Sequence, residues 1–222
     1  MGALLFLGMT RSRAEGDEPV AGAQPAAYDA YGVGRLLAFS DGVFAIAITL
    51  LVLSVPVPSL PAGSDPSGRL AAELVRLAPN LGAFALSFVL VGVHWMVHHG
   101  LLREVRRADR GLMWLNVLTL LGICLVPLAT TVLVRYGDLP SGCIAYAAVQ
   151  VLISLCYTAL RFYLAAQAGR GRRRALLSLV QLAGFAASIP VALLSVNAAY
   201  GLWMGGLVLA RFIDGWTRAS GR

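Results

Sequence analysis

The chain has 222 residues, of which 58% are hydrophobic and 13% are charged. Soluble domains carry about 25% charged residues, so this composition excludes an ordinary soluble domain and favours a protein whose outer face meets lipid. All 18 basic residues are arginine and they lie between apolar runs, which indicates membrane orientation rather than nucleic-acid binding.

The first 30 residues are rich in alanine, glycine, proline and acidic residues. This composition predicts a flexible N-terminal leader over residues 1–30. Its short apolar stretch, residues 3–9, is not preceded by a positive region and is therefore only a weak candidate for a signal peptide.

Six apolar segments follow, each close to the roughly 20 residues that span a hydrocarbon core. They cover residues 36–57, 77–100, 112–134, 143–166, 175–196 and 198–213, and the last two predict a tight helical hairpin around Asn197. The predicted fold is all-α: a polytopic membrane protein with six transmembrane helices over residues 31–216 and a short cytoplasmic tail over 217–222. No TVGYG-like sequence is present, so we expect no re-entrant filter loop.

Arginine positions predict the orientation of these segments. Fourteen arginines lie in the leader, the even-numbered loops and the tail, whereas only three lie in the connections on the other side: Arg69, Arg76 and Arg135. Cytoplasmic loops carry the excess of positive charge, so both termini are expected in the cytoplasm, with the protein in the cell membrane. The exclusive use of arginine and the richness in alanine, glycine and leucine hint at a GC-rich bacterial genome.

The first apolar segment carries two charged residues in its first turns, Arg35 and Asp41. Intramembrane charge is costly and usually faces a polar partner, although Arg35 also suits an interfacial position. At about 100° per residue, one narrow stripe repeats at alternating spacings of three and four, with Ser40 and Asp41 lying away from it. The stripe consists of Phe39, Gly42, Ile46, Thr49 and Leu53. Such a stripe is typical of a helix that packs around an axis with copies of itself, and also of ordinary helix–helix core.

The next two segments offer partners for the polar side of this helix. Trp95 and His98 lie one turn apart near the cytoplasmic end of the second segment, and Asn116 begins the third at the same depth. We expect one structural polar network that fixes the packing of the helices. Its members are Arg35, Ser40, Asp41, Trp95, His98 and Asn116.

The histidines allow two other interpretations. His94 and His98 have the i, i+4 spacing of a zinc pair, but no HExxH glutamate and no third ligand accompany them, so no metal is predicted. A proton relay through Asp41 and His98 is chemically reasonable. The cysteines are expected to pack as small apolar side chains: Cys124, Cys143 and Cys156. The sequence has no P-loop and no GxSxG motif, so we predict neither an enzyme nor a bound cofactor.

Three motifs resemble one known family. The first segment reads R-x-x-x-F-S-D over Arg35, Phe39, Ser40 and Asp41; the second reads L-S-F-x-x-V-G-x-x-W-x-x-H-H; and the third reads W-L-N-V-L-T-L-L. Over residues 35–135 the chain resembles the lysosomal potassium channel family (transmembrane protein 175) and its bacterial homologues.

The resemblance implies a channel permeable to potassium and other monovalent cations, in which bacterial members with one six-helix unit per chain assemble as homotetramers in the lipid bilayer. The first helices would line the pore, with apolar rings at Ile46, Leu50 and Leu53 forming the constriction and gate. Thr49 would assist selectivity, and Phe39 would join the structural network. Because these rings coincide with the stripe, we favour a pore over ordinary core. The alternatives are a proton-coupled secondary transporter using Asp41 and His98, a histidine-based metal protein or membrane enzyme, and a purely structural membrane subunit.

Overall fold

The computed structural model describes residues 24–58, 66–105, 108–168 and 173–206, and their regular secondary structure is entirely helical. The elements in chain order are α1 (Gln24–Leu50), the 3-10 helix η1 (Leu51–Ser54), α2 (Pro66–Arg76), α3 (Ala78–Arg103), α4 (Arg110–Tyr136), α5 (Pro140–Ala168) and α6 (Arg173–Leu194). Residues 196–206 are also helical.

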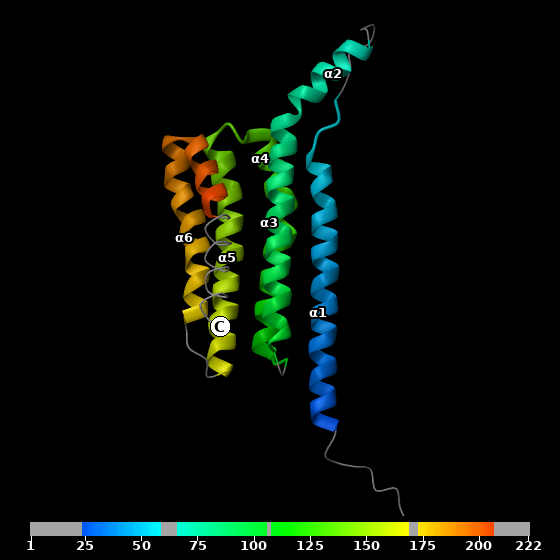
Figure 1. Ribbon diagram of the computed structural model, residues 1–222, viewed down its shortest axis with the longest axis vertical. Coiled ribbons are helices and arrows are strands. Elements are labelled where there is room, and N and C mark those ends of the chain that lie inside the picture. Colours follow the sequence, from blue (N-terminus) through cyan, green and yellow to red (C-terminus); the bar gives the residue numbers. More distant parts are fainter. Residues whose placement is uncertain (1–23, 59–65, 106–107, 169–172, 207–222) are drawn as a thin grey trace, which may run out of the picture.

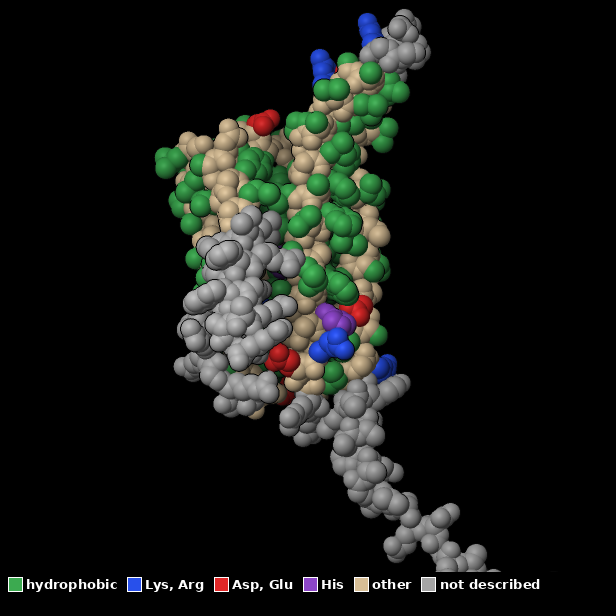
Figure 2. Space-filling view, in the orientation of Figure 1, with side chains coloured by type: hydrophobic (Ala, Val, Ile, Leu, Met, Phe, Trp, Pro, Cys, Tyr) green, Lys and Arg blue, Asp and Glu red, His purple; other side chains and the backbone are tan. Residues whose placement is uncertain are grey.

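The long helices form a bundle in which α1, α3, α4, α5 and α6 run side by side (Figure 1). α1 packs on α3 and α4, while α5 packs between α4 and α6. α1 and α6 therefore lie at opposite edges of the bundle. Figure 2 shows apolar side chains along the visible face, with charged and histidine side chains gathered toward its two ends.

Four stretches of the described residues are long and apolar enough to cross a membrane: Gly32–Ser54, Ala78–Arg103, Arg110–Tyr136 and Pro140–Gln167. They correspond to the first four predicted segments. The apolar helix Leu179–Leu194 is shorter, and the sixth predicted segment, 198–213, continues beyond the described residues. The all-helical membrane fold is thus confirmed, whereas the count of six spans and the absence of a re-entrant loop stay predictions.

Both ends of the first helix differ from the sequence prediction. α1 begins at Gln24, inside the leader predicted to be flexible over 1–30; residues 1–23 lie outside the described part. At the other end, the α-helix tightens into η1, and Val55 is extended with ψ of 117°. Pro56 explains this ending, because a proline disfavours helical backbone in the residue before it.

The short helix α2 lies in a connection for which no helix was predicted. Arg69, Glu73 and Arg76 recur at helical spacing on one side, and Arg76 forms an ion pair of 3.1 Å with Glu73. Leu70 and Leu74 occupy the other side and are exposed. α2 inclines away from the bundle beyond the end of α1 (Figure 1). The signal available in the sequence was this amphipathic period.

The predicted hairpin near the end of the chain breaks at Ser195, two residues before Asn197. The Ser195 hydroxyl accepts a hydrogen bond of 3.3 Å from the backbone N–H of Ala198. A serine hydroxyl in this position satisfies one of the free N–H groups at the start of a helix. The capping serine therefore fixes where the next helix starts.

Candidate functional site

α1 has two contrasting faces in the single chain. One face is packed against α3 and α4 by Phe44 and Ala47 of α1 and by Leu51 of η1, which are 3% exposed or less. The residues of the predicted stripe are uncovered: Phe39 is 57% exposed, Ile46 61% and Leu53 76%, and Gly42 and Thr49 are also exposed. The stripe derived from spacing therefore coincides with the face that the chain's own helices do not cover.

Thr49 contributes the hydroxyl of this uncovered face. Its Oγ1 donates a hydrogen bond of 2.8 Å to the backbone carbonyl of Ile46. Because the proton is used within the helix, the lone pairs of the oxygen stay available as acceptors on the exposed side. Chemically, Thr49 presents an oxygen rather than a donor to whatever approaches this face.

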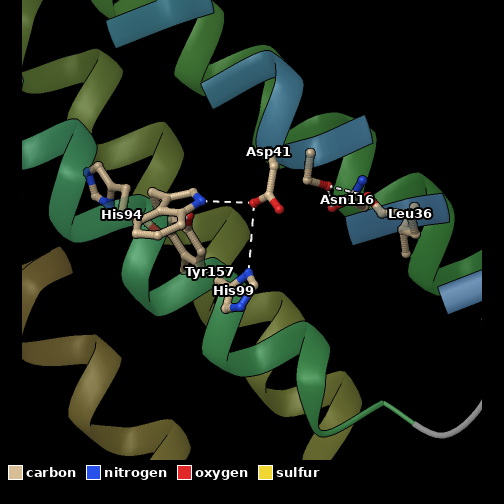
Figure 3. Close-up of polar contacts among 8 residues, drawn as sticks. Leu36, Asp41, His94, His99, Asn116 and Tyr157 are labelled. Carbon is tan, nitrogen blue, oxygen red and sulfur yellow. Dashed lines mark hydrogen bonds and ion pairs between the residues drawn. The ribbon is translucent and has the colours of Figure 1, made fainter. Parts of the chain in front are cut away.

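Ser40 and Asn116 form a buried contact between α1 and α4. Ser40 Oγ lies 3.2 Å from Asn116 Oδ1 and 2.8 Å from the carbonyl of Leu36, and both polar side chains are fully buried. A hydroxyl has one proton, so Ser40 donates to one of these oxygens at a time. The contact is drawn in Figure 3.

Asp41 contacts α3 at the edge of the bundle. Its Oδ1 accepts a hydrogen bond of 2.8 Å from Trp95 Nε1 and lies 3.7 Å from His99 Nδ1 (Figure 3). The side chain of Asp41 is 44% exposed, so the carboxylate is not enclosed within the bundle as the sequence suggested. Trp95 and His99 lie one turn apart, with ring centroids separated by 5.6 Å. Both side chains therefore contact the Asp41 carboxylate from the same face of α3.

His98 is separate from this contact and points into the core. It is 1% exposed, and its ring centroid lies 5.4 Å from that of Phe44 and 5.9 Å from that of Tyr157. Neither ring nitrogen has a hydrogen-bond partner in the described part of the chain, although the amide of Asn116 is close.

The predicted single network is therefore two clusters. Ser40, Asn116 and His98 lie inside, whereas Asp41, Trp95 and His99 lie at the edge. Around the axis of α3, His99 lies about 40° from Trp95, whereas His98 lies about 60° from Trp95 in the opposite direction, toward the core. His99 and not His98 is therefore the histidine that meets Asp41. Arg35 is exposed, near the start of the first membrane-spanning stretch.

A set of buried polar contacts that was not predicted from the sequence joins α3, α4 and α5. Thr130 Oγ1 donates to Ser87 Oγ at 2.8 Å, and Ser87 Oγ lies 3.1 Å from the hydroxyl of Tyr146. His94 Nε2 lies 3.1 Å from Gln150 Oε1, and the Tyr157 hydroxyl donates to the His94 carbonyl at 2.8 Å. The available signal was a stripe at spacings of four, four and three on α5: Tyr146, Gln150, Ser154 and Tyr157.

Asp109 lies in the connection between α3 and α4, immediately before the first residue of α4. Its carboxylate caps α4 by accepting the Leu112 N–H at 2.8 Å, and it also accepts from the Tyr163 hydroxyl at 2.8 Å and from Gln167 Nε2 at 2.7 Å. The Leu112 N–H, followed by the Tyr163 hydroxyl, lowers the pKa of Asp109. An aspartate immediately before an apolar run is a recognised helix start, and this signal was overlooked.

The geometry of the described residues also bears on a metal site and on the cysteines. Among the described residues, no three His, Cys, Asp or Glu side chains lie close enough to hold a metal ion. All three cysteines are free; Cys143 is buried, Cys156 is half-buried and Cys124 is exposed. Packing as small apolar residues therefore describes Cys143 best.

Comparisons with known proteins identify the family. The family model described as endosomal/lysosomal potassium channel TMEM175 matches residues 35–127. The crystal structure of a lysosomal potassium-selective channel TMEM175 homologue from Chamaesiphon minutus superposes with a TM-score of 0.71 and 30% identity, covering 83% of this chain and 97% of that one. The chain belongs to the TMEM175 family. The matched residues include α1 from Arg35 onward and both polar clusters.

Relatives in this family bear channel names. A potassium channel of Streptomyces collinus is 42% identical over 135 residues, which cover 59% of this chain and 64% of that protein. The human endosomal/lysosomal proton channel TMEM175 is 41% identical over 99 residues, covering 43% of this chain and 20% of that protein. The chain thus aligns with less than two thirds of either relative. The potassium channel MtTMEM175, with a TM-score of 0.57 at 16% identity, shares the fold.

Proposed function

We propose that this TMEM175-family chain is one subunit of a potassium-permeable cation channel, with a pore lined by α1 of each copy. The observation that carries the proposal is the uncovered face of α1. That face runs from Phe39 to Leu53, and it includes a glycine and a threonine among its apolar residues. Relatives named as potassium channels favour a conducting role for it.

The gate in this proposal consists of apolar rings. Ile46 and Leu50 lie about 40° apart around the axis of α1, Leu53 follows on η1, and all three are exposed in the single chain. Copies of these side chains facing one axis would form a narrow constriction from which water withdraws, and an ion cannot cross a dry constriction. A small rotation of α1 would widen the rings and restore water.

Selectivity in this proposal rests on Thr49. Its hydroxyl oxygen faces the uncovered side while its proton is donated to Ile46. A ring of such oxygens would replace part of the hydration shell of potassium.

The assembly and topology follow the same proposal. We propose a homotetramer with six spans per chain, located in a bacterial cell membrane with both termini cytoplasmic. Arg103 and Arg110 lie at the end of the bundle that also carries the two polar clusters, whereas Arg76 and Arg135 lie at the other. The proposed cytoplasmic side of the bundle is supported by four arginines in the connection between α3 and α4: Arg103, Arg106, Arg107 and Arg110.

The decisive experiment measures potassium flux in proteoliposomes, together with the subunit number of the purified protein. Ile46→Asn is expected to raise resting flux about tenfold, because a polar ring no longer repels water. Leu128→Asn on α4 is the matched control, since Leu128 is 63% exposed and Ile46 is 61% exposed. Unchanged flux in Ile46→Asn, or an equal rise in Leu128→Asn, would remove α1 from the pore.

The alternative is a proton-coupled secondary transporter using Asp41 and His98. Its specific support is the approach of Asp41 to a histidine, although that histidine is His99. It predicts saturable, pH-driven uptake of a substrate rather than passive potassium flux.

A further inference from the structure

The short helix α2 carries its charged and its apolar side chains on opposite sides. At about 100° per residue, the charged members share an arc of about 60° around the helix axis: Arg69, Glu73 and Arg76. The larger apolar members are centred about 160° away from that arc. They are Leu70, Leu74 and Val75, and they are 42%, 52% and 74% exposed. The described part of the chain therefore leaves the apolar side of α2 uncovered.

The connections of α2 hold it at the edge of the membrane. One spanning stretch ends at Ser54, and the next begins at Ala78, with only Leu77 between it and α2. Leu77 has helical backbone angles, with φ of −75° and ψ of −10°. Its N–H donates to the Glu73 carbonyl at 3.1 Å, and its carbonyl accepts from the Leu81 N–H at 2.9 Å. Helical hydrogen bonding thus runs from α2 into α3 and leaves little slack. Because a spanning helix begins at the boundary of the hydrocarbon core, α2 is confined to that boundary.

The orientation of α2 suits a membrane surface. The helix is inclined to the long helices and leaves the bundle beyond the end of α1 (Figure 1). Figure 2 shows the basic side chains of α2 along its upper edge, turned away from the bundle, with apolar side chains below them. If the membrane surface lies at this end of the bundle, the charged side of α2 meets headgroups and water while the apolar side meets the hydrocarbon.

We propose that α2 is an interfacial helix that binds the lipid bilayer. Leu70, Leu74 and Val75 insert among the acyl chains, while Arg69 and Arg76 are directed at the lipid phosphate groups. The proposal goes beyond potassium conduction and does not depend on a pore.

The charges of α2 favour lipid as the partner. Its charged side carries two guanidinium groups and one carboxylate, and that carboxylate pairs with Arg76 at 3.1 Å, so a net positive charge remains. Guanidinium groups match the geometry of phosphate oxygens. A helix with arginine on its polar side and leucine on its apolar side binds at the boundary between headgroups and acyl chains. The competing occupant of the apolar side is a neighbouring copy of the chain, which would keep acyl chains away from it.

The test measures whether acyl chains touch the apolar side of α2. Leu74→Cys and the matched control Arg69→Cys are each labelled with bimane, and the full chain is reconstituted in phosphatidylcholine with or without bromine on its acyl chains. Bromine quenches only a fluorophore that it approaches closely. Fluorescence of labelled Leu74→Cys is expected to fall about threefold in brominated lipid, whereas that of Arg69→Cys should change by less than about 1.3-fold. The wild type, labelled in parallel, gives the background from the native cysteines: Cys124, Cys143 and Cys156.

A second reporter and the colour of the emission make the result decisive. Val75→Cys also lies on the apolar side and should be quenched like Leu74→Cys, so the test survives if Leu74→Cys fails to fold. Equal quenching on the two sides of α2 would overturn the inference. An unquenched apolar side would overturn it as well: blue-shifted emission there would mean that a neighbouring copy covers α2, and emission as in water would mean that the helix stands in solvent. Absence of potassium flux would defeat the proposed channel and leave the quenching readable.

Discussion

The indole Nε1 of Trp95 donates a hydrogen bond of 2.8 Å to Oδ1 of Asp41 and so joins α3 to α1 at the edge of the bundle. Asp41 lies five residues before Ile46 on the same helix, about 140° around its axis. The contact therefore holds α1 from the side that faces away from the stripe. It fixes the rotation of the helix without occupying the uncovered face.

The first prediction concerns this hydrogen bond. Trp95→Phe keeps a large ring but removes the donor, and we expect the melting temperature of the purified protein to fall by about 2–4 °C, the effect of roughly 1 kcal/mol in a chain of this length. Trp114→Phe, on the exposed face of α4, is the control and should melt like the wild type. Equal melting of all three proteins would mean that the bond contributes nothing to stability.

The second prediction concerns selectivity. Thr49→Val has nearly the same shape but removes the outward oxygen, so the ratio of potassium to sodium flux should fall about threefold to tenfold while total flux persists. Thr131→Val removes a hydroxyl that also bonds its own helix, at Pro127 on α4, and should leave the ratio unchanged. A ratio that survives Thr49→Val would assign selectivity to another part of the chain.

Periodicity predicted much of α1. Spacing alone separated Ile46 and Leu53 from Ser40, and the structure buries Ser40 while exposing the other two. Such a pattern is readable because a helix fixes which residues share a face. The pairing of Trp95 with Asp41 was also predictable, since each helix offers few polar groups at that depth.

Other features depend on how helices are rotated against their neighbours, which one helix's sequence does not define. The choice of His99 over His98 is such a case, because the two differ by only 100° on α3. The buried polar contacts between α3, α4 and α5 were not predicted, because Gln150 and Tyr157 lie in a segment whose hydropathy indicates only that it spans the membrane. The 3-10 turn at Leu51–Ser54 needed the local effect of Pro56, a signal visible in the sequence but outweighed by the apolar run.

The third prediction concerns the close approach of α4 and α5. A Cβ added at Gly122 would lie 2.8 Å from Cγ1 of Ile153, and a β-branched side chain has little freedom to move away. Gly122→Ala should therefore destabilise the protein by about 1–3 kcal/mol. Gly184→Ala, where no other described part of the chain comes within 4 Å of the added Cβ, should be neutral or slightly stabilising. Thermal unfolding in detergent measures both, and a neutral Gly122→Ala would show that α4 and α5 separate freely.

The fourth prediction concerns Asp109 and acid. Hydrogen bonds from the Leu112 N–H and then the Tyr163 hydroxyl hold the pKa of this carboxyl below its ordinary value. A group whose pKa is lower in the folded state stabilises the fold at pH values above its unfolded pKa, and this contribution is lost as pH falls through the folded pKa. The stability that Asp109 supplies should therefore be constant near neutrality and disappear below about pH 4.

Asp109→Asn separates this charge effect from helix capping, because asparagine caps a helix about as well as aspartate. The melting temperature of the wild type should exceed that of Asp109→Asn by about 1–3 °C near neutral pH, a modest value because the carboxylate is partly exposed to solvent. The two curves should converge in acid as the wild-type carboxyl takes up its proton. Asp138→Asn, at an exposed position beyond the other end of α4, is the control and should follow the wild type. A gap that stays constant down to the lowest pH would show that the Asp109 charge is not the source of the difference.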